Sequence, residues 1–200
     1  MTDNERAATR ARALTSLLVE KEIVTQEELE RAQEEMATWS PAIGARAVAK
    51  AWADPTFRSR LMEDANEAFA ELGVTDELPD RLVALANTPK VHNVVVCTLC
   101  SCYPSRILGP APEWYKSLNY RARAVREPRV VLEEFGVSLD PEVEVRVYDS
   151  TADVRYLVVP MRPEGTEDLD EAALSRLVTR DSMVGVGLAG TTGRSGYSGR

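Results

Sequence analysis

The chain is 200 residues long, with 28% charged residues, 44% hydrophobic residues and a formal net charge of -8. This length and composition are typical of a globular protein that buries its own core. The acidic balance argues against nucleic acid as a partner, because phosphate binding needs a basic face. No apolar run approaches the roughly 18 residues of a membrane span, and the start is not typical of a secretory signal. We therefore expect a cytoplasmic protein with no membrane contact.

The first third of the chain predicts a series of helices. Residues 7–22 carry three leucines on one face, and residues 25–28 form a capping box for the helix that follows. Residues 40–41 and 54–55 each place a capping side chain directly before a proline, which is typical of a helix start. We expect the second of these helices to continue through Leu72.

The hydrophobic pattern changes after this helical region. Valine-rich runs at residues 81–86 and 91–96 predict strands. Later segments predict helices at residues 112–119, 128–135 and 170–179 and strands at residues 142–148 and 155–159. The order of elements predicts an α+β fold. Its expected parts are an N-terminal helical arm of residues 1–73, an α+β domain of residues 74–189 and a flexible tail of residues 190–200.

Three cysteines, Cys97, Cys100 and Cys102, fall within one short segment. An odd and clustered set does not match the disulfide framework of a secreted protein, so metal ligands are the better interpretation. A structural zinc site needs four side-chain ligands, and the chain has one histidine, His92. On a strand of residues 91–96, His92 and Cys97 point to opposite faces. We therefore expect His92 to be a hydrogen-bonded structural residue.

A redox motif is an alternative interpretation, because Cys97 and Cys100 have Cys-x-x-Cys spacing. Such a motif normally opens a helix after a strand. Here Cys102 and Pro104 follow at once, which argues against a regular helix. A non-catalytic thiol module that binds metal or exchanges disulfides would be colourless and would carry reducible thiols.

The spacing of Cys100 and Cys102 favours a different kind of site. Their sulfurs can close around a metal ion whose other neighbours are the backbone nitrogens of Ser101 and Cys102. Cys97 can add a third sulfur from one side and leave the sixth position open. Thiolates and deprotonated amides are strong donors that suit a trivalent transition metal better than zinc, magnesium or calcium. An open position is typical of a catalytic metal site.

The segment of residues 97–102, Cys-Thr-Leu-Cys-Ser-Cys, resembles the metal-binding claw of nitrile hydratase α subunits. Its threonine resembles the cobalt branch of that family rather than the iron branch. The resemblance covers roughly residues 87–187. It includes Asn87-Thr88-Pro89, Pro112-Glu113-Trp114-Tyr115-Lys116, Tyr120-Arg121, Arg126-Glu127-Pro128-Arg129 and Val178-Thr179-Arg180-Asp181-Ser182-Met183.

The resemblance implies a layered α-β-β-α domain after the helical arm. It also implies one non-corrin cobalt(III) ion per chain, with iron less expected, bound by Cys97, Cys100, Cys102 and the amides of Ser101 and Cys102. Cys100 would be oxidised to sulfinate and Cys102 to sulfenate, which are known steps of cysteine oxidation. A β-type partner subunit would supply arginines to these oxygens, and an activator protein would deliver the metal.

The implied activity is hydration of a nitrile to an amide by the heteromer, with Cys100, Ser101 and Cys102 as catalytic residues. The sulfenate oxygen of Cys102 would act as nucleophile or as base. Thiocyanate hydrolase, a related enzyme, has the same claw and acts on an anion, so it is the alternative function. Arg106 beside the pocket would suit that substrate.

The chain departs from the family pattern near the claw. Ser105 and Arg106 replace a usual Trp-Pro, and Leu78 stands where a glutamine is common. We expect Ser105 and Arg106 to line the substrate pocket. Because serine is much smaller than tryptophan, the pocket should favour bulky or heteroaromatic nitriles, and the family includes a member that acts on a nucleoside nitrile.

The sequence contains two other patterns, a basic run and a glycine-rich segment. The basic run of residues 121–129 is interpreted as a solvated face or as a salt-bridged interface with the partner subunit. Residues 185–190 match G-x-G-x-x-G, but a dinucleotide site also needs a following helix and an acidic residue, which this sequence lacks. These glycines are therefore predicted to form a packing turn.

Overall fold

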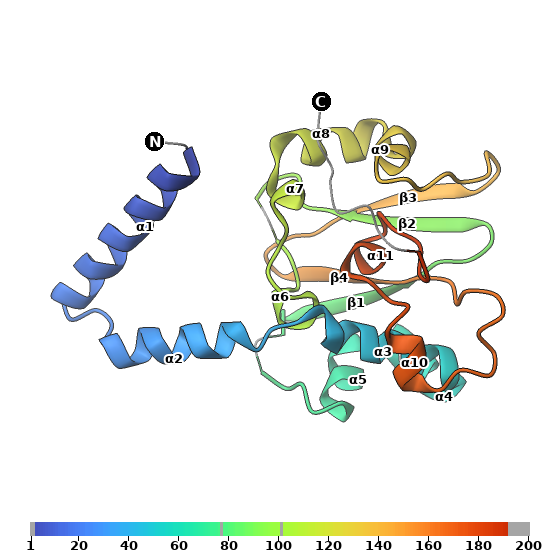
Figure 1. Cartoon of the computed structure of the whole chain (residues 1–200), viewed down its shortest axis with the longest axis horizontal. Coiled ribbons are helices and arrows are strands. Elements are labelled where there is room, and N and C mark those ends of the chain that lie inside the picture. The colour runs from blue at the N-terminus through green and yellow to red at the C-terminus, as the bar shows by residue number, and fades with distance from the viewer. Residues whose placement is uncertain (1–2, 77, 101, 192–200) are drawn as a thin grey trace. The chain divides into compact units, whose positions relative to one another are not determined.

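The computed structural model describes residues 3–76, 78–100 and 102–191 and divides the chain into two compact units, Met1–Thr38 and Trp39–Arg200. The first unit contains α1 (Asp3–Glu20) and α2 (Gln26–Ala37), drawn in blue in Figure 1. The predicted capping box is confirmed, since Thr25 Oγ1 accepts from Glu28 N at 3.1 Å and Thr25 N donates to Glu28 Oε2 at 2.8 Å. No described helix is long and apolar enough to cross a membrane.

The second unit begins with α3 (Pro41–Ala53), α4 (Pro55–Glu63) and α5 (Ala65–Glu71). The prediction of one helix from Pro55 through Leu72 is wrong, because Asp64 divides it. The backbone of Asp64 is extended, and its carboxylate accepts from Glu67 N at 3.0 Å, which caps α5. The same residue thus ends one helix and begins the next.

Four strands form two separate parallel pairs. They are β1 (Arg81–Ala86), β2 (Val91–Val96), β3 (Glu144–Asp149) and β4 (Val154–Val159). β1 pairs with β4, and β2 pairs with β3. The predicted bounds of the first two strands are confirmed, whereas β3 and β4 are shifted slightly from the predicted positions.

The second unit has the predicted α-β-β-α order of layers (Figure 1). α4 and α5 contact β1, β4 contacts β2, and the far side is covered by α8 (Leu118–Arg126) on β2 and α9 (Pro128–Glu134) on β3. Four short helices complete it: α6 (Ser105–Leu108), α7 (Glu113–Lys116), α10 (Glu171–Ser175) and α11 (Arg180–Val184). α4 and α5 contact β1, and α3 contacts α4, α6, α10 and α11, so these three helices belong to the second compact unit, which begins at Trp39.

His92 is buried and hydrogen-bonded, which confirms its predicted structural role. Its Nε2 lies 2.7 Å from Gly185 O, and its Nδ1 lies 3.2 Å from Asn87 Nδ2. Asn87 Oδ1 accepts from Asn93 N at 2.8 Å, so the asparagine amide group must face the imidazole. Nδ1 therefore accepts, Nε2 carries the proton, and the ring is neutral.

Gly185 shows that the glycine-rich segment is a packing turn, as predicted. It is the left-handed cap that ends α11, with φ 92°. A Cβ built at this position would lie 1.9 Å from Asn93 O, so no side chain fits. Through Gly185 and His92, the turn after α11 is fastened to β2.

We predict that His92 makes the stability of the fold depend on pH. Burial lowers the pKa of His92, although the hydrogen bond to Gly185 opposes this shift. As the pH falls below about 6.5, the unfolded chain binds a proton that the folded chain does not, so the free energy of unfolding decreases until the folded pKa is reached. Urea unfolding between about pH 7.5 and about pH 5.5 should show a steeper decrease for the wild type than for His92→Gln. Equal slopes would contradict this prediction, whatever the absolute stabilities.

Candidate metal centre

The three cysteines lie where β2 ends. Cys97 directly follows β2, whose last residue, Val96, is paired with Asp149 at the end of β3. The Ser150 amide extends this pairing by donating to Val96 O at 2.7 Å. Parallel strands end at the same edge of a sheet, so the loop of residues 97–102 begins beside Asp149.

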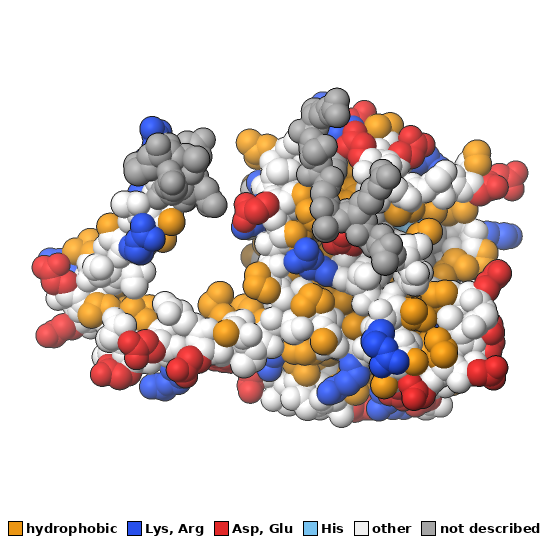
Figure 2. Space-filling model, viewed as in Figure 1, with side chains coloured by type: hydrophobic (Ala, Val, Ile, Leu, Met, Phe, Trp, Pro, Cys, Tyr) orange, Lys and Arg blue, Asp and Glu red, His pale blue; other side chains and the backbone are white. Residues whose placement is uncertain are grey.

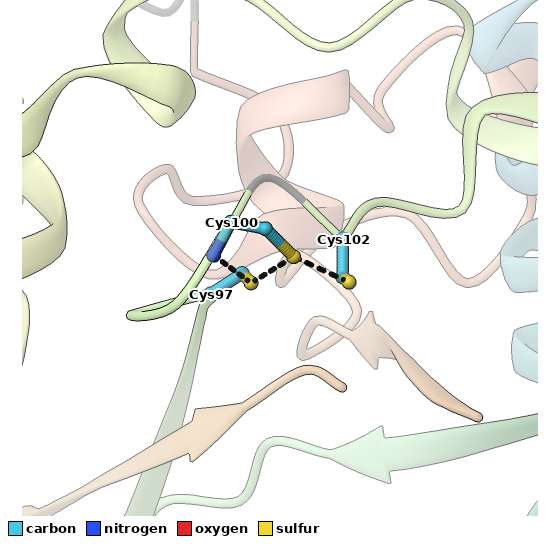
Figure 3. Close-up of side chains that lie close together, drawn as sticks. All are labelled: Cys97, Cys100 and Cys102. Atoms are coloured by element: carbon cyan, nitrogen blue, oxygen red, sulfur yellow. Dashed lines mark hydrogen bonds between the residues drawn. The ribbon is translucent and has the colours of Figure 1, made fainter. Parts of the chain in front are cut away.

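The three sulfurs point toward one another (Figure 3). Cys97 Sγ lies 3.3 Å from Cys100 Sγ, and Cys100 Sγ lies 2.9 Å from Cys102 Sγ. All three lie within 4.8 Å of one another, and none of these cysteines forms a disulfide. Two sulfurs bound at right angles to one metal at about 2.3 Å would be about 3.3 Å apart. The separations therefore fit three ligands of a single metal ion.

The cluster has a closed side and an open side. Cys97 is buried, Cys102 is half-buried and Cys100 is exposed. Leu99, within the same loop, has 88% of its surface exposed. Cys97 therefore forms the floor of the cluster, and solvent reaches it from the side of Cys100.

Two side chains of opposite charge hold the peptide groups of the loop. Asp149 accepts from Thr98 N at 2.9 Å and from Thr98 Oγ1 at 2.5 Å. Arg121 donates from Nε to Cys97 O at 2.9 Å and from Nη2 to Thr98 O at 2.8 Å. Thr98 is thus held through its N–H, its hydroxyl and its carbonyl before the second cysteine is reached.

Two buried tyrosines hold the backbone on either side of the cluster. Tyr115 OH donates to Cys102 O at 2.9 Å, and Tyr120 OH donates to Val95 O at 2.7 Å. Both rings contact Trp114 edge to face, at centroid distances of 5.9 and 4.9 Å. Such aromatic contacts limit ring movement, so the two hydroxyls are fixed donors.

The electrostatic environment keeps Cys102 protonated in the absence of metal. Burial, followed by the hydrogen bond with the Cys100 thiol, raises the pKa of Cys102 to about 12, whereas the positive charge of Arg155 lowers it. A thiol must lose its proton to bind a metal ion. Metal binding at this site is therefore coupled to proton release.

The structure brings together the predicted ligands Cys97, Cys100 and Cys102, while Ser101 lies outside the described residues. Ser105 begins α6 and is half-buried, with its N–H donating to Tyr103 O at 2.9 Å. Arg106 is half-buried, and its Nε has no hydrogen-bond partner among the described residues. Two described hollows, of ≈ 350 and ≈ 280 Å³, are lined by neither Ser105 nor Arg106.

Arg121 and Asp149 contact the cysteine loop but were not among the predicted site residues. Arg121 was included in the basic run interpreted as a solvated face or an interface, but it binds the claw loop. Arg123 in the same run pairs with Glu127 and Glu134. Asp149 ends an alternating strand, and the parallel pairing that brings it to Thr98 is not visible in the sequence. The Tyr-Arg pair at residues 120–121 is part of the family resemblance, and this resemblance was the one sequence signal that pointed to Arg121.

The family is shown by the match of a family model. The model for the nitrile hydratase alpha chain matches residues 5–187. This span contains the arm, the two sheets and the cysteine cluster. The chain therefore belongs to the nitrile hydratase α-chain family.

Several relatives share most of the chain. The low-molecular weight cobalt-containing nitrile hydratase subunit alpha of Rhodococcus rhodochrous is 47% identical over 193 residues, covering 96% of this chain and 93% of the relative. Thiocyanate hydrolase subunit gamma of Thiobacillus thioparus is 45% identical over 185 residues, covering 87% and 76%. A solved double mutant of the Fe-type nitrile hydratase from Comamonas testosteroni Ni1 has a TM-score of 0.87 at 43% identity, covering 94% and 92%. Metal and substrate thus differ among the relatives.

We predict that Tyr115→Phe destabilises the chain through the loss of one hydrogen bond. The variant keeps the ring but leaves Cys102 O without its buried donor, which should cost about 1–3 kcal/mol of unfolding free energy. Tyr156→Phe is the matched control, because no hydrogen bond of the Tyr156 hydroxyl is found among the described residues. Urea unfolding of the metal-free chains should separate the two variants. Equal stabilities would show that the Tyr115 hydroxyl does not support the loop.

Proposed function

We propose that this chain is the metal-binding subunit of a nitrile hydratase and binds one cobalt(III) ion through Cys97, Cys100 and Cys102. The observation that carries the proposal is the convergence of three cysteine sulfurs at the end of β2. The backbone nitrogens of Ser101 and Cys102 complete the proposed ligand set. Cobalt is favoured over iron because of Thr98 and because of the 47% identity to a cobalt-containing relative.

The donor set is suited to this metal. Thiolates and deprotonated amides stabilise a trivalent ion, and a ligand set of five leaves one position for substrate. Cobalt(III) bound here would supply Lewis acidity toward a nitrile or water. We further propose that an activator protein delivers the metal, since uptake requires proton loss from Cys102, whose pKa is about 12.

Burial supports a specific pattern of cysteine oxidation. We propose that Cys100 takes up both atoms of one dioxygen molecule to become sulfinate and that Cys102 takes one oxygen atom from hydrogen peroxide, which leaves as water, to become sulfenate, while Cys97 remains a thiolate. Oxidation follows thiolate character and access. Cys100 is exposed and Cys102 is half-buried, whereas the surface of Cys97 is fully enclosed. Cys100, which is assigned two oxygen atoms, is the exposed cysteine, and Cys97, which is assigned none, is the fully enclosed one.

The proposed reaction adds one water molecule across the C≡N bond and gives an amide. The sulfenate oxygen of Cys102 would either attack the nitrile carbon or take a proton from the attacking water. Tyr115 holds the carbonyl of Cys102 and therefore the position of its sulfur. Single-turnover labelling with ¹⁸O water distinguishes the two roles, because only direct attack transfers unlabelled sulfenate oxygen to the first amide.

We propose that the active enzyme includes a β-type partner subunit. Sulfenate and sulfinate oxygens need hydrogen-bond donors, and two arginines of this chain that were candidates for that role, Arg121 and Arg155, bind backbone carbonyls instead. Arg121 binds Cys97 and Thr98, and Arg155 binds Ala152 O at 2.7 Å. Arginines from a partner would meet this need. Leu99 within the cysteine loop, 88% exposed, gives such a partner an apolar side chain to cover.

Thiocyanate hydrolysis is the second candidate function. Arg106 has a buried Nε without a described partner, and a guanidinium in that state suits an anionic substrate. The 45% identity to a thiocyanate hydrolase subunit supports the same alternative. Comparing kcat/KM for thiocyanate and for a neutral nitrile in the complete complex decides between the two.

The metal and the cysteine oxidation give the direct test of the proposed function. The purified complex should contain one cobalt per chain when cobalt and iron are both supplied. Mass spectrometry should find two added oxygen atoms on Cys100, one on Cys102 and none on Cys97. A colourless protein with three reducible thiols would instead support the non-catalytic thiol module. Iron with full activity would refute the cobalt assignment.

We predict that Ser105→Trp narrows the substrate pocket. Ser105 follows the claw at the start of α6, and an indole there would fill space beside the proposed open metal position. A large heteroaromatic nitrile should lose at least about tenfold in kcat/KM relative to a small aliphatic one, about 1.4 kcal/mol of transition-state stabilisation. Steady-state kinetics of the complex measures this ratio. Equal losses for both nitriles would show that Ser105 does not set pocket size.

A further inference from the structure

We propose that Arg121 is a positioning residue that holds the metal-free claw loop in its metal-binding conformation and thereby sets how tightly the chain retains its metal. The inference rests on the proposed function, because it assumes that Cys97, Cys100 and Cys102 are ligands. It assigns to Arg121 a role that the thiol ligands cannot fill, since Arg121 contacts the loop through backbone oxygens.

The contact is a two-point one. Nε and Nη2 lie on one edge of the guanidinium plane, and they meet the carbonyl oxygens of two successive residues, Cys97 and Thr98, at 2.9 and 2.8 Å. Two parallel hydrogen bonds from a rigid fork fix orientation as well as distance. A lysine ammonium has no such fork and acts as a point charge.

Arg121 is itself carried on a fixed element. Its amide donates to Ser117 O at 3.1 Å within the first turn of α8, and Ser117 Oγ caps that helix by accepting from Tyr120 N at 3.1 Å. Tyr120 is fully buried and binds Val95 O on β2. A hydrogen bond therefore joins α8, which contains Arg121, to β2, the strand directly before Cys97.

The two carbonyls matter because they decide how the loop leaves β2. Arg121 turns both oxygens toward α8, while Asp149 holds the N–H and hydroxyl of Thr98. With these peptide groups fixed, Cys97 Sγ stays 3.2 Å from Cys100 N and 3.3 Å from Cys100 Sγ. Without Arg121, the two carbonyls would find water, and metal binding would have to order the loop at an entropic cost.

The test is cobalt binding by the purified full chain under anaerobic conditions, with Co²⁺ as the probe and thiolate-to-metal absorption as the signal. Supporting groups of this kind change metal affinity by about 10–100-fold. We expect Arg121→Met to bind Co²⁺ at least about tenfold more weakly and to release it faster to a chelator. Arg121→Lys should be intermediate. Arg126→Met, in the same helix but exposed, should match the wild type.

Absorption spectra show whether Arg121→Met changes the geometry of the bound metal, and thermal unfolding shows whether the variant is folded. At saturating Co²⁺, the absorption band of Arg121→Met should shift because Cys97 is displaced, whereas Arg126→Met should keep the wild-type band. If Arg121→Met does not fold, Arg121→Lys decides, and wild-type affinity in that variant would overturn the inference. Cys100→Ser shows that the signal comes from the claw. Absence of cobalt from the wild-type chain in the complete complex would overturn the proposed function together with the inference, whereas equal Co²⁺ binding and equal release by the wild type and Arg121→Met would overturn the inference alone.

Discussion

The parallel pairing of β2 with β3 is the constraint on which the candidate metal centre depends. It places Val96 opposite Asp149, so the first peptide groups of the claw loop leave the sheet beside a carboxylate. Asp149 then accepts two hydrogen bonds from Thr98. A slip of one residue would turn Asp149 to the other face of the sheet and remove both bonds. The positions of the sulfurs therefore depend on the register in which the buried valines of β2 pair with β3.

The interruption between α7 and α8 also determines which residues contact the loop of residues 97–102. One continuous helix was predicted over residues 112–119, but Ser117 caps a new helix instead. The break lets Tyr115 in α7 reach Cys102 O while Arg121 in α8 reaches Cys97 O. Both ends of the claw are thus held by one short stretch of chain, whose aromatic residues pack on one another.

Local features of the fold were predictable because they depend on neighbouring residues. The capping box at Thr25, the prolines that open α3 and α4, and the bounds of β1 and β2 all follow from local sequence. The helix break at Asp64 was not predicted, because an aspartate in a helical pattern can be either a solvated side chain or the cap of a new helix. The packing of α5 on β1 determines which of the two forms. The break at Ser117 was missed for the same reason.

The sequence was enough to predict the candidate ligands, but not the residues that contact the loop around them. The close spacing of Cys97, Cys100 and Cys102 identifies them as candidate metal ligands. The partners of Thr98 are Asp149 and Arg121, which are remote in sequence and come from a different strand and a helix. An arginine that donates to carbonyls has the same local sequence signature as one in a solvated basic run.

Burial around the claw leads to a conclusion about assembly. The proposed oxidation of Cys100 and the entry of substrate both need Cys100 to be accessible, and in this chain it is exposed. Stabilising charged sulfur oxygens, however, needs donors in a site from which water is excluded, because electrostatic interactions weaken in solvent. Arg121 and Arg155 of this chain already bind backbone carbonyls. A single chain thus satisfies the first requirement but not the second. A partner that covers Leu99 and brings its own arginines satisfies both, provided that it binds after the metal and oxygen have entered.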